Sequence, residues 1–108
     1  MFLSFMDKLA LLAEILTQNP NDAFARYGLA MEHAAQGNTE AAFAEFEKLL
    51  AANPDYVPGH QMYAQTLAKA GRTADAVAQL NSGIAAAQRT GNQHALSEME
   101  GMLDELSG

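Results

Sequence analysis

The sequence predicts an all-α protein of the α-α superhelix class with about six helices. Three observations support this prediction. Ala, Leu, Met, Glu and Gln, which favour helices, dominate the 108 residues, whereas β-branched residues are few. Apolar residues recur at the spacing of one helix face. The chain also repeats its own pattern at a fixed offset, the one that separates Pro20 from Pro54, which indicates an array of similar helical units.

This fixed offset relates proline to proline, glycine to glycine and apolar to apolar positions along the chain. The pairs are Pro20 and Pro54, Gly37 and Gly71, Ala42 and Ala76, Leu29 and Tyr63, Ala30 and Ala64, and Phe46 and Leu80. Each unit therefore holds two helices. We expect the alanines to lie where these helices cross closely.

Residues 4–17 are predicted to form the first helix, a half repeat whose apolar residues Leu9, Leu12 and Leu16 meet the next helix. Pro20 ends this helix because proline has no N–H and its ring clashes with the preceding turn. The side chains of Asn21 and Asp22 can accept N–H bonds where the next helix begins, and Asp55 has the same place in the second copy.

The two full repeats are predicted at residues 21–54 and 55–88. Within each repeat a glycine, Gly37 or Gly71, separates two helices, because glycine tolerates the left-handed conformation that ends a helix. We expect Asn38 or Thr39, and then Thr73, to cap the helix that follows. The second repeat has Gln88 where the first has its closing Pro54.

A last helix within residues 91–107 places Leu96, Met99, Leu103 and Leu106 on one face. A repeat array needs such a capping helix, because its last unit would otherwise expose a core face. We therefore expect a single domain over residues 1–108.

This pattern resembles the tetratricopeptide repeat (TPR), a helix-turn-helix unit of about 34 residues. The matching positions are Leu29, Ala30, Gly37, Ala42, Phe46, Leu49 and Pro54, and in the second copy Tyr63, Ala64, Gly71, Ala76, Leu80 and Gly83. Arg26 and His60 depart from the family by replacing its early aromatic residue. The whole chain is similar to short bacterial stand-alone TPR proteins of unassigned function.

The residues give no sign of catalysis, a metal or a cofactor. Cysteine is absent, and the histidines, His33, His60 and His94, lack a metal-ligand spacing such as H-E-x-x-H. We expect His33 and His60 to be partly buried and His94 to be exposed. Glu40, Glu45 and Glu47 are expected on a solvated helix face. The prediction is a protein that is not an enzyme.

The net charge of −7 argues against nucleic acid and against an anionic membrane surface as partners. The start of the chain lacks the basic n-region of a signal peptide, and no apolar run reaches the length of a membrane span. We therefore expect a cytoplasmic protein whose partner is a protein or peptide.

By the TPR resemblance, the first helix of each unit lines a concave groove that binds a peptide or helix. The resemblance assigns to this groove Phe24, Tyr27, Met31, Gln61, Gln65 and Lys69, with Tyr56 at its rim. The alternative is that Phe24, Tyr27 and Met31 only pack against residues 4–17. Some family members bind acidic chaperone tails through cations, which are absent at the corresponding positions, so we expect no such binding here.

The N-terminal helix has more apolar residues than one face can bury. Phe2, Phe5, Leu9 and Leu11 are candidates for self-association, since exposed apolar patches often mark interfaces. The alternative is that residues 1–5 fray or that the natural start is Met6. The sequence thus predicts a small TPR adaptor, with a homodimer formed through the N-terminal helix as the second hypothesis.

Overall fold

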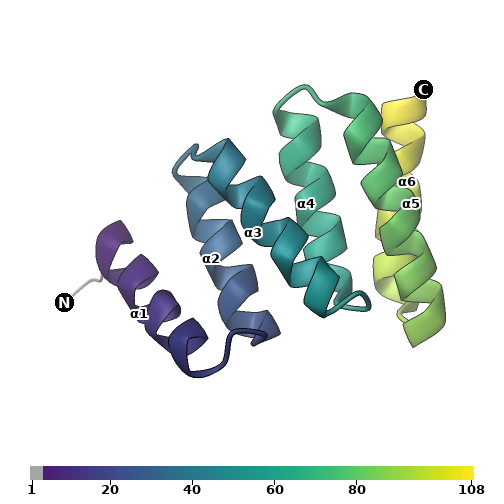
Figure 1. The fold of residues 1–108 in the computed structure, drawn as a ribbon. Helices are drawn as coiled ribbons and strands as arrows, with labels where there is room; N and C mark the ends of the chain where they lie inside the picture. The colour runs from purple at the N-terminus through teal and green to yellow at the C-terminus, as the bar shows by residue number, and fades with distance from the viewer. Residues whose placement is uncertain (1–3) are drawn as a thin grey trace. The chain divides into compact units, whose positions relative to one another are not determined.

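A computed structural model describes residues 4–108, and within this range it contains six α-helices and no strand (Figure 1). The prediction of an all-α repeat fold with six helices is confirmed. The helices are α1 (Phe5–Gln18), α2 (Ala23–Ala35), α3 (Thr39–Ala52), α4 (Val57–Lys69), α5 (Thr73–Thr90) and α6 (Gln93–Ser107).

The helices form two compact units, of which the first ends at Asn53 and the second begins at Pro54. In the first unit α1 packs against α2, and α2 packs against α3. In the second unit α5 packs against both α4 and α6, and α6 also contacts α4. In Figure 1 the capping helix α6 lies behind α5, as an amphipathic helix covering the last repeat should.

Local signals in the sequence explain where the helices begin and end. Ser4 and Asp7 form a capping box at the start of α1, and the Asp22 side chain caps α2 by accepting a bond from the Ala25 N–H. Gly37 and Gly71 have φ angles of +78° and +80°, so the predicted left-handed helix ends are confirmed.

Pro20 and Pro54 also act as predicted. Helices α1 and α3 end two residues before these prolines. Because Gln88 stands where a further closing proline would be, α5 runs on to Thr90 and has 18 residues, compared with 14 in α3.

Asn38 holds the predicted cap position of α3 but makes no side-chain cap bond, and two other predicted caps were wrong. Thr73 is the first residue inside α5, and Arg72 takes the cap position. The reason is the tight turn after Gly71, in which the Arg72 N–H bonds the Leu67 carbonyl at 2.9 Å and leaves no room for a longer connection. Asp55 does not cap α4 but accepts two bonds from the guanidinium of Arg89, at 2.7 and 2.9 Å.

The core consists of the repeat positions that the sequence singles out. Ala30, Ala42, Ala64 and Ala76 are completely buried, which supports their role as close-packing residues. Phe46, Leu49, Leu80 and Met99 are the largest fully buried side chains among the described residues. A Cβ atom added at Gly83 would come within 2.6 Å of Met99 Sδ, so α5 and α6 approach closely there.

Candidate functional site

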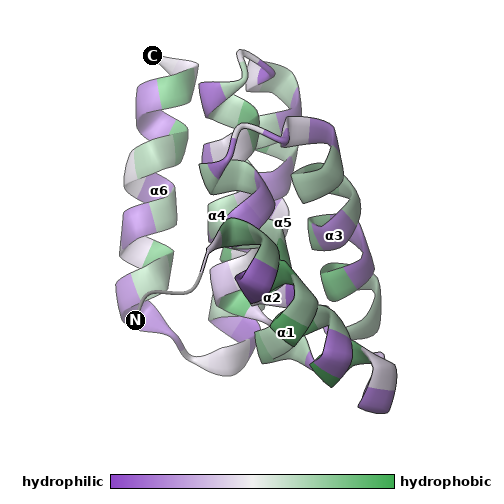
Figure 2. Ribbon diagram, turned by 90° about the vertical axis from the view of Figure 1, so that its left-hand side faces the viewer, coloured by the Kyte–Doolittle hydropathy of each residue, from purple (hydrophilic) through white to green (hydrophobic). Residues whose placement is uncertain are grey.

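An apolar pocket of about 330 Å³ lies between α1 and α2 in the first unit. From α1 it is lined by Lys8, Leu11 and Leu12. From α2 it is lined by Phe24, Tyr27, Gly28, Met31 and Glu32, which recur at the spacing of one helix face. In Figure 2, hydrophobic positions, coloured green, recur along the ribbons of α1 and α2.

The pocket depends on the close packing of its two helices. Gly28 has no side chain, and a Cβ atom there would lie 3.2 Å from Leu12 Cδ2. The leucine therefore packs directly onto the backbone of α2. A larger residue at position 28 would push the Leu12 side chain toward the pocket.

Two large apolar side chains of the pocket are exposed. Phe24 is 76% exposed and Leu11 is 54% exposed. Tyr27 and Met31 also line the pocket and are half-buried. Exposed apolar side chains around a concave apolar surface are typical of a site that a partner covers.

The single charged pair of the pocket joins its two walls. Lys8 Nζ lies 3.6 Å from Glu32 Oε1, and their side chains are 48% and 24% exposed. An ion pair with this much exposure contributes little to stability, so it does not explain by itself why these charges line an apolar pocket.

The structure brings together residues that the sequence assigned to two different surfaces. Phe24, Tyr27 and Met31 were predicted groove residues, whereas Leu11 was predicted for self-association, and all four line one pocket. Phe5 and Leu9 are half-buried. The Phe5 ring packs edge-on against His33, with ring centroids 6.2 Å apart. Phe2 lies outside the described residues.

The other predicted groove residues lie in the second unit. Tyr56 is half-buried at the start of α4, and Gln65 and Lys69 are exposed on the same helix. Gln61 is half-buried, and its amide lies 3.4 Å from Glu98 Oε1 of α6. The capping helix thus covers part of the α4 face on which Gln61 lies.

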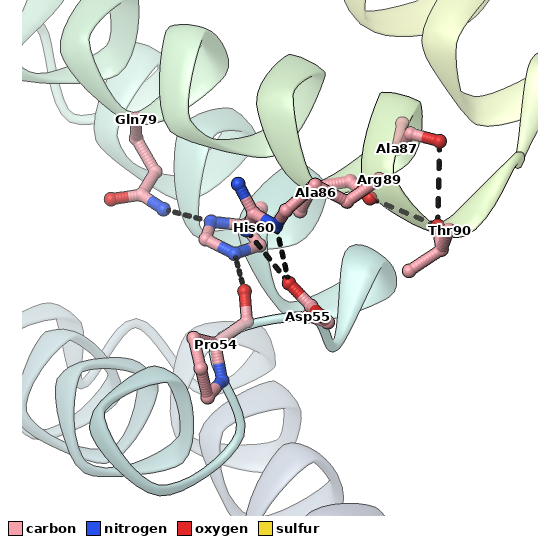
Figure 3. A network of polar contacts seen from close by, with 8 residues as sticks. All are labelled: Pro54, Asp55, His60, Gln79, Ala86, Ala87, Arg89 and Thr90. Carbon is pink, nitrogen blue, oxygen red and sulfur yellow. Dashed lines mark hydrogen bonds and ion pairs between the residues drawn. The ribbon is translucent and has the colours of Figure 1, made fainter.

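A polar link that recurs in both repeats was not predicted from the sequence. In the first, Arg26 donates to Glu45 Oε2 at 2.7 Å and to the Pro20 carbonyl at 3.0 Å. In the second, His60 bonds the Pro54 carbonyl at 2.7 Å and Gln79 at 2.7 Å (Figure 3). A carbonyl oxygen only accepts, so His60 Nε2 carries a proton, and in the neutral ring Nδ1 accepts from the Gln79 amide.

The three residues of each link are related by the repeat offset itself: Pro20 and Pro54, Arg26 and His60, and Glu45 and Gln79. The placement of Glu45 on a solvated face was therefore wrong, because its side chain is only 14% exposed. Arg26 and His60 stand where the family has an aromatic residue. Each bonds both the carbonyl of the proline that precedes its repeat's first helix and a side chain on the second helix. The sequence did contain a signal for this link, because its three residues in the first repeat and its three residues in the second are separated by the same repeat offset.

The expected burial of the histidines is confirmed. His60 is buried, with 6% of its surface exposed, and His33 is half-buried. The side chain of His94 is 87% exposed and lies 3.4 Å from Glu98. Within residues 4–108, no group of three His, Asp or Glu side chains is placed to hold a metal ion.

A family model described as a tetratricopeptide repeat matches residues 33–99, which is more than half of the chain. The chain belongs to the tetratricopeptide repeat family. TPR proteins are generally non-catalytic protein–protein interaction modules, built on concave surfaces of stacked helices. None of the helices in residues 4–108 combines the length and hydropathy that a membrane crossing requires.

Solved structures agree with this family. A TPR domain protein from Salinibacter ruber is 35% identical, with a TM-score of 0.76, over 82% of this chain and 89% of that one. A protein from Bordetella parapertussis is 27% identical, with a TM-score of 0.78, over 92% and 86% of the two chains.

The fold is also that of the TPR2B domain of yeast Sti1, solved in a complex with pHsp70. It is 17% identical, with a TM-score of 0.87, over 95% of this chain and 82% of that one. A comparison with curated proteins found no match.

Proposed function

We propose that this TPR protein is a small adaptor that binds a peptide or helix of another protein through the pocket between α1 and α2. The observation that carries the proposal is the 76% exposure of Phe24 beside an apolar pocket of about 330 Å³. Burying an exposed phenylalanine side chain contributes roughly 1.5–3 kcal/mol of free energy, which becomes available when a partner covers Phe24. The bacterial origin of two similar structures supports a bacterial source.

We propose the predicted groove residues of the second unit as a separate contact surface of that unit. Gln65 and Lys69 are exposed on α4 and are available to bond the polar groups of a partner. We expect them, together with Tyr56 and Gln61, to contribute less than the pocket does. Apolar and aromatic anchors dominate binding energy in most interfaces, whereas exposed polar residues mainly add specificity.

The test is partner capture from a cell extract of the source organism. Leu11→Ser with Phe24→Ser should abolish recovery of specific partners, because both side chains are exposed and their loss leaves the fold intact. Met6→Ser is the matched control, since Met6 is 70% exposed on α1 but does not line the pocket. An unchanged set of partners with the double variant would contradict the proposal.

The second candidate is self-association through α1. Its support is the exposure of Met6 and Leu11 on one helix. Phe5 and Leu9, being half-buried, have less surface to offer a second copy. Light scattering should give a dimer mass for the intact chain and a lower mass for Leu11→Ser or a chain that begins at Met6. Identical monomer masses for all three proteins would remove this candidate.

A further inference from the structure

The charges around the pocket indicate what kind of segment it binds. Residues 4–53 contain seven acidic and three basic side chains, a formal charge of −4 with histidine neutral. Of the three basic residues, Arg26 is held by Glu45 and Pro20, and Lys48 lies beside Glu45. Lys8 is the remaining one, and it is paired with Glu32 at the pocket.

This charge distribution discriminates between the partners that could cover the pocket. A second copy of the chain brings the same negative unit and is repelled, whereas a basic segment is attracted and steered to the site. An acidic segment would meet the same repulsion as a second copy. The charge of a partner therefore decides whether it binds here as much as its shape does.

The Lys8–Glu32 pair provides the specific contact for a cation. The pair is partly exposed and its atoms are 3.6 Å apart, so a partner's ammonium or guanidinium group can replace Lys8 at little cost. Replacement keeps Glu32 paired while the partner's apolar side chain enters beside it. An arginine suits this exchange best, since its planar fork can hold both carboxylate oxygens.

The volume of the pocket limits how much apolar surface enters. About 330 Å³ is at the lower end of the range for binding pockets, which is about 300–1,000 Å³. It suits one or two side chains of a helix rather than the length of an extended chain. Such an anchor occupies the space bounded by Leu11, Tyr27 and Met31.

We propose that the pocket between α1 and α2 binds an amphipathic basic segment. One apolar face enters the pocket, and a Lys or Arg next to it pairs with the Glu32 carboxylate in place of Lys8. This inference rests on the proposed adaptor function and specifies the chemistry of the partner.

Three synthetic amphipathic helices test the inference. All carry the same Leu and Trp anchors, and their flanking positions are Lys, Gln or Glu. The protein has no Trp, so peptide fluorescence reports binding directly, and amide NMR spectra of the intact protein locate it. We expect the Lys peptide to bind about 3- to 10-fold more tightly than the Gln peptide, and the Glu peptide to bind most weakly.

Charge-matched variants separate Glu32 from the general charge of the protein. Glu32→Gln should weaken the binding of the Lys peptide by about 2- to 5-fold and leave the binding of the Gln peptide unchanged. Glu14→Gln is the control, because it removes the same charge from α1 outside the pocket. Lys8→Gln should strengthen the binding of the Lys peptide. Lys48→Gln, which changes the net charge by the same amount, should have a smaller effect on this binding.

The remaining possible results of these experiments each refute a different claim. Equal binding of all three peptides at the pocket, or equal effects of Glu32→Gln and Glu14→Gln, refutes the charge inference and leaves the adaptor function standing. Pocket signals that shift with protein concentration alone, together with a dimer mass, identify a second copy as the occupant. If no peptide moves the pocket signals, both the inference and the proposed function fail.

Discussion

Replacing Arg26 with methionine measures what the polar link contributes to stability. The side chains of Arg26 and Glu45 are 17% and 14% exposed, and their nearest atoms are 2.7 Å apart. Without the guanidinium, the half-buried carboxylate keeps only Lys48 at 3.8 Å, and the Pro20 carbonyl loses its donor. Hydrogen bonds to charged groups contribute about 1.5–3 kcal/mol each, and part of this is recovered through water, so the expected cost is about 2–3 kcal/mol.

Urea unfolding followed by circular dichroism tests this value. With a denaturant slope of about 1–3 kcal/mol/M, the midpoint should fall by roughly 0.7–3 M. Arg89→Met is the matched control. Its partner Asp55 is also 2.7 Å away, but these two side chains are 53% and 54% exposed, so the cost should stay below about 1 kcal/mol.

A double-mutant cycle with Glu45→Met completes the test. If the two residues act as one link, the double variant should cost about 1–2 kcal/mol less than the sum of the single variants. Additive costs would refute the reasoning, as would equal losses for Arg26→Met and Arg89→Met. Additive costs would mean that Arg26 and Glu45 do not act as one link, and equal losses would mean that burial does not distinguish the two ion pairs.

Glycine-to-alanine substitutions at three positions should have different outcomes in thermal unfolding. Gly83→Ala should destabilise by about 1–3 kcal/mol, because the new Cβ would lie 2.6 Å from Met99 Sδ and 2.8 Å from His60 Cβ, and equal stability would contradict the packing. Gly71→Ala should cost about 1 kcal/mol through its φ of +80° alone, since nothing lies within 4 Å. Gly101→Ala should stabilise α6 by roughly 0.5–1 kcal/mol, because its surroundings are open and its φ is ordinary for a helix; a loss there would argue against this helix.

The elements of the fold were predictable because their signals are local. A proline ends a helix through its own ring, and Gly37 and Gly71 turn the chain through their own φ angles. The internal repeat then supplied each of these signals twice. The misplaced cap at Thr73 shows the limit, since the length of the turn depends on which carbonyl the Arg72 N–H bonds.

The candidate site was predictable only in part, because it depends on how helices meet. Phe24, Tyr27 and Met31 share a face of α2, which helical spacing shows. That Leu11 faces the same pocket depends on how α1 is rotated against α2, where Leu12 packs closely against Gly28. The pairing of Arg26 with Glu45 likewise joins residues 19 positions apart on two helices.

All residues of each polar link lie within one repeat length of the chain. The segment 20–53 contains Pro20, Arg26 and Glu45, and the segment 54–87 contains Pro54, His60 and Gln79. A duplicated block therefore carries its own copy of this link and takes none of the link's donors or acceptors from its neighbour. The gene could lengthen by whole blocks, and engineers could splice in further copies, without stranding a buried polar group at the seam.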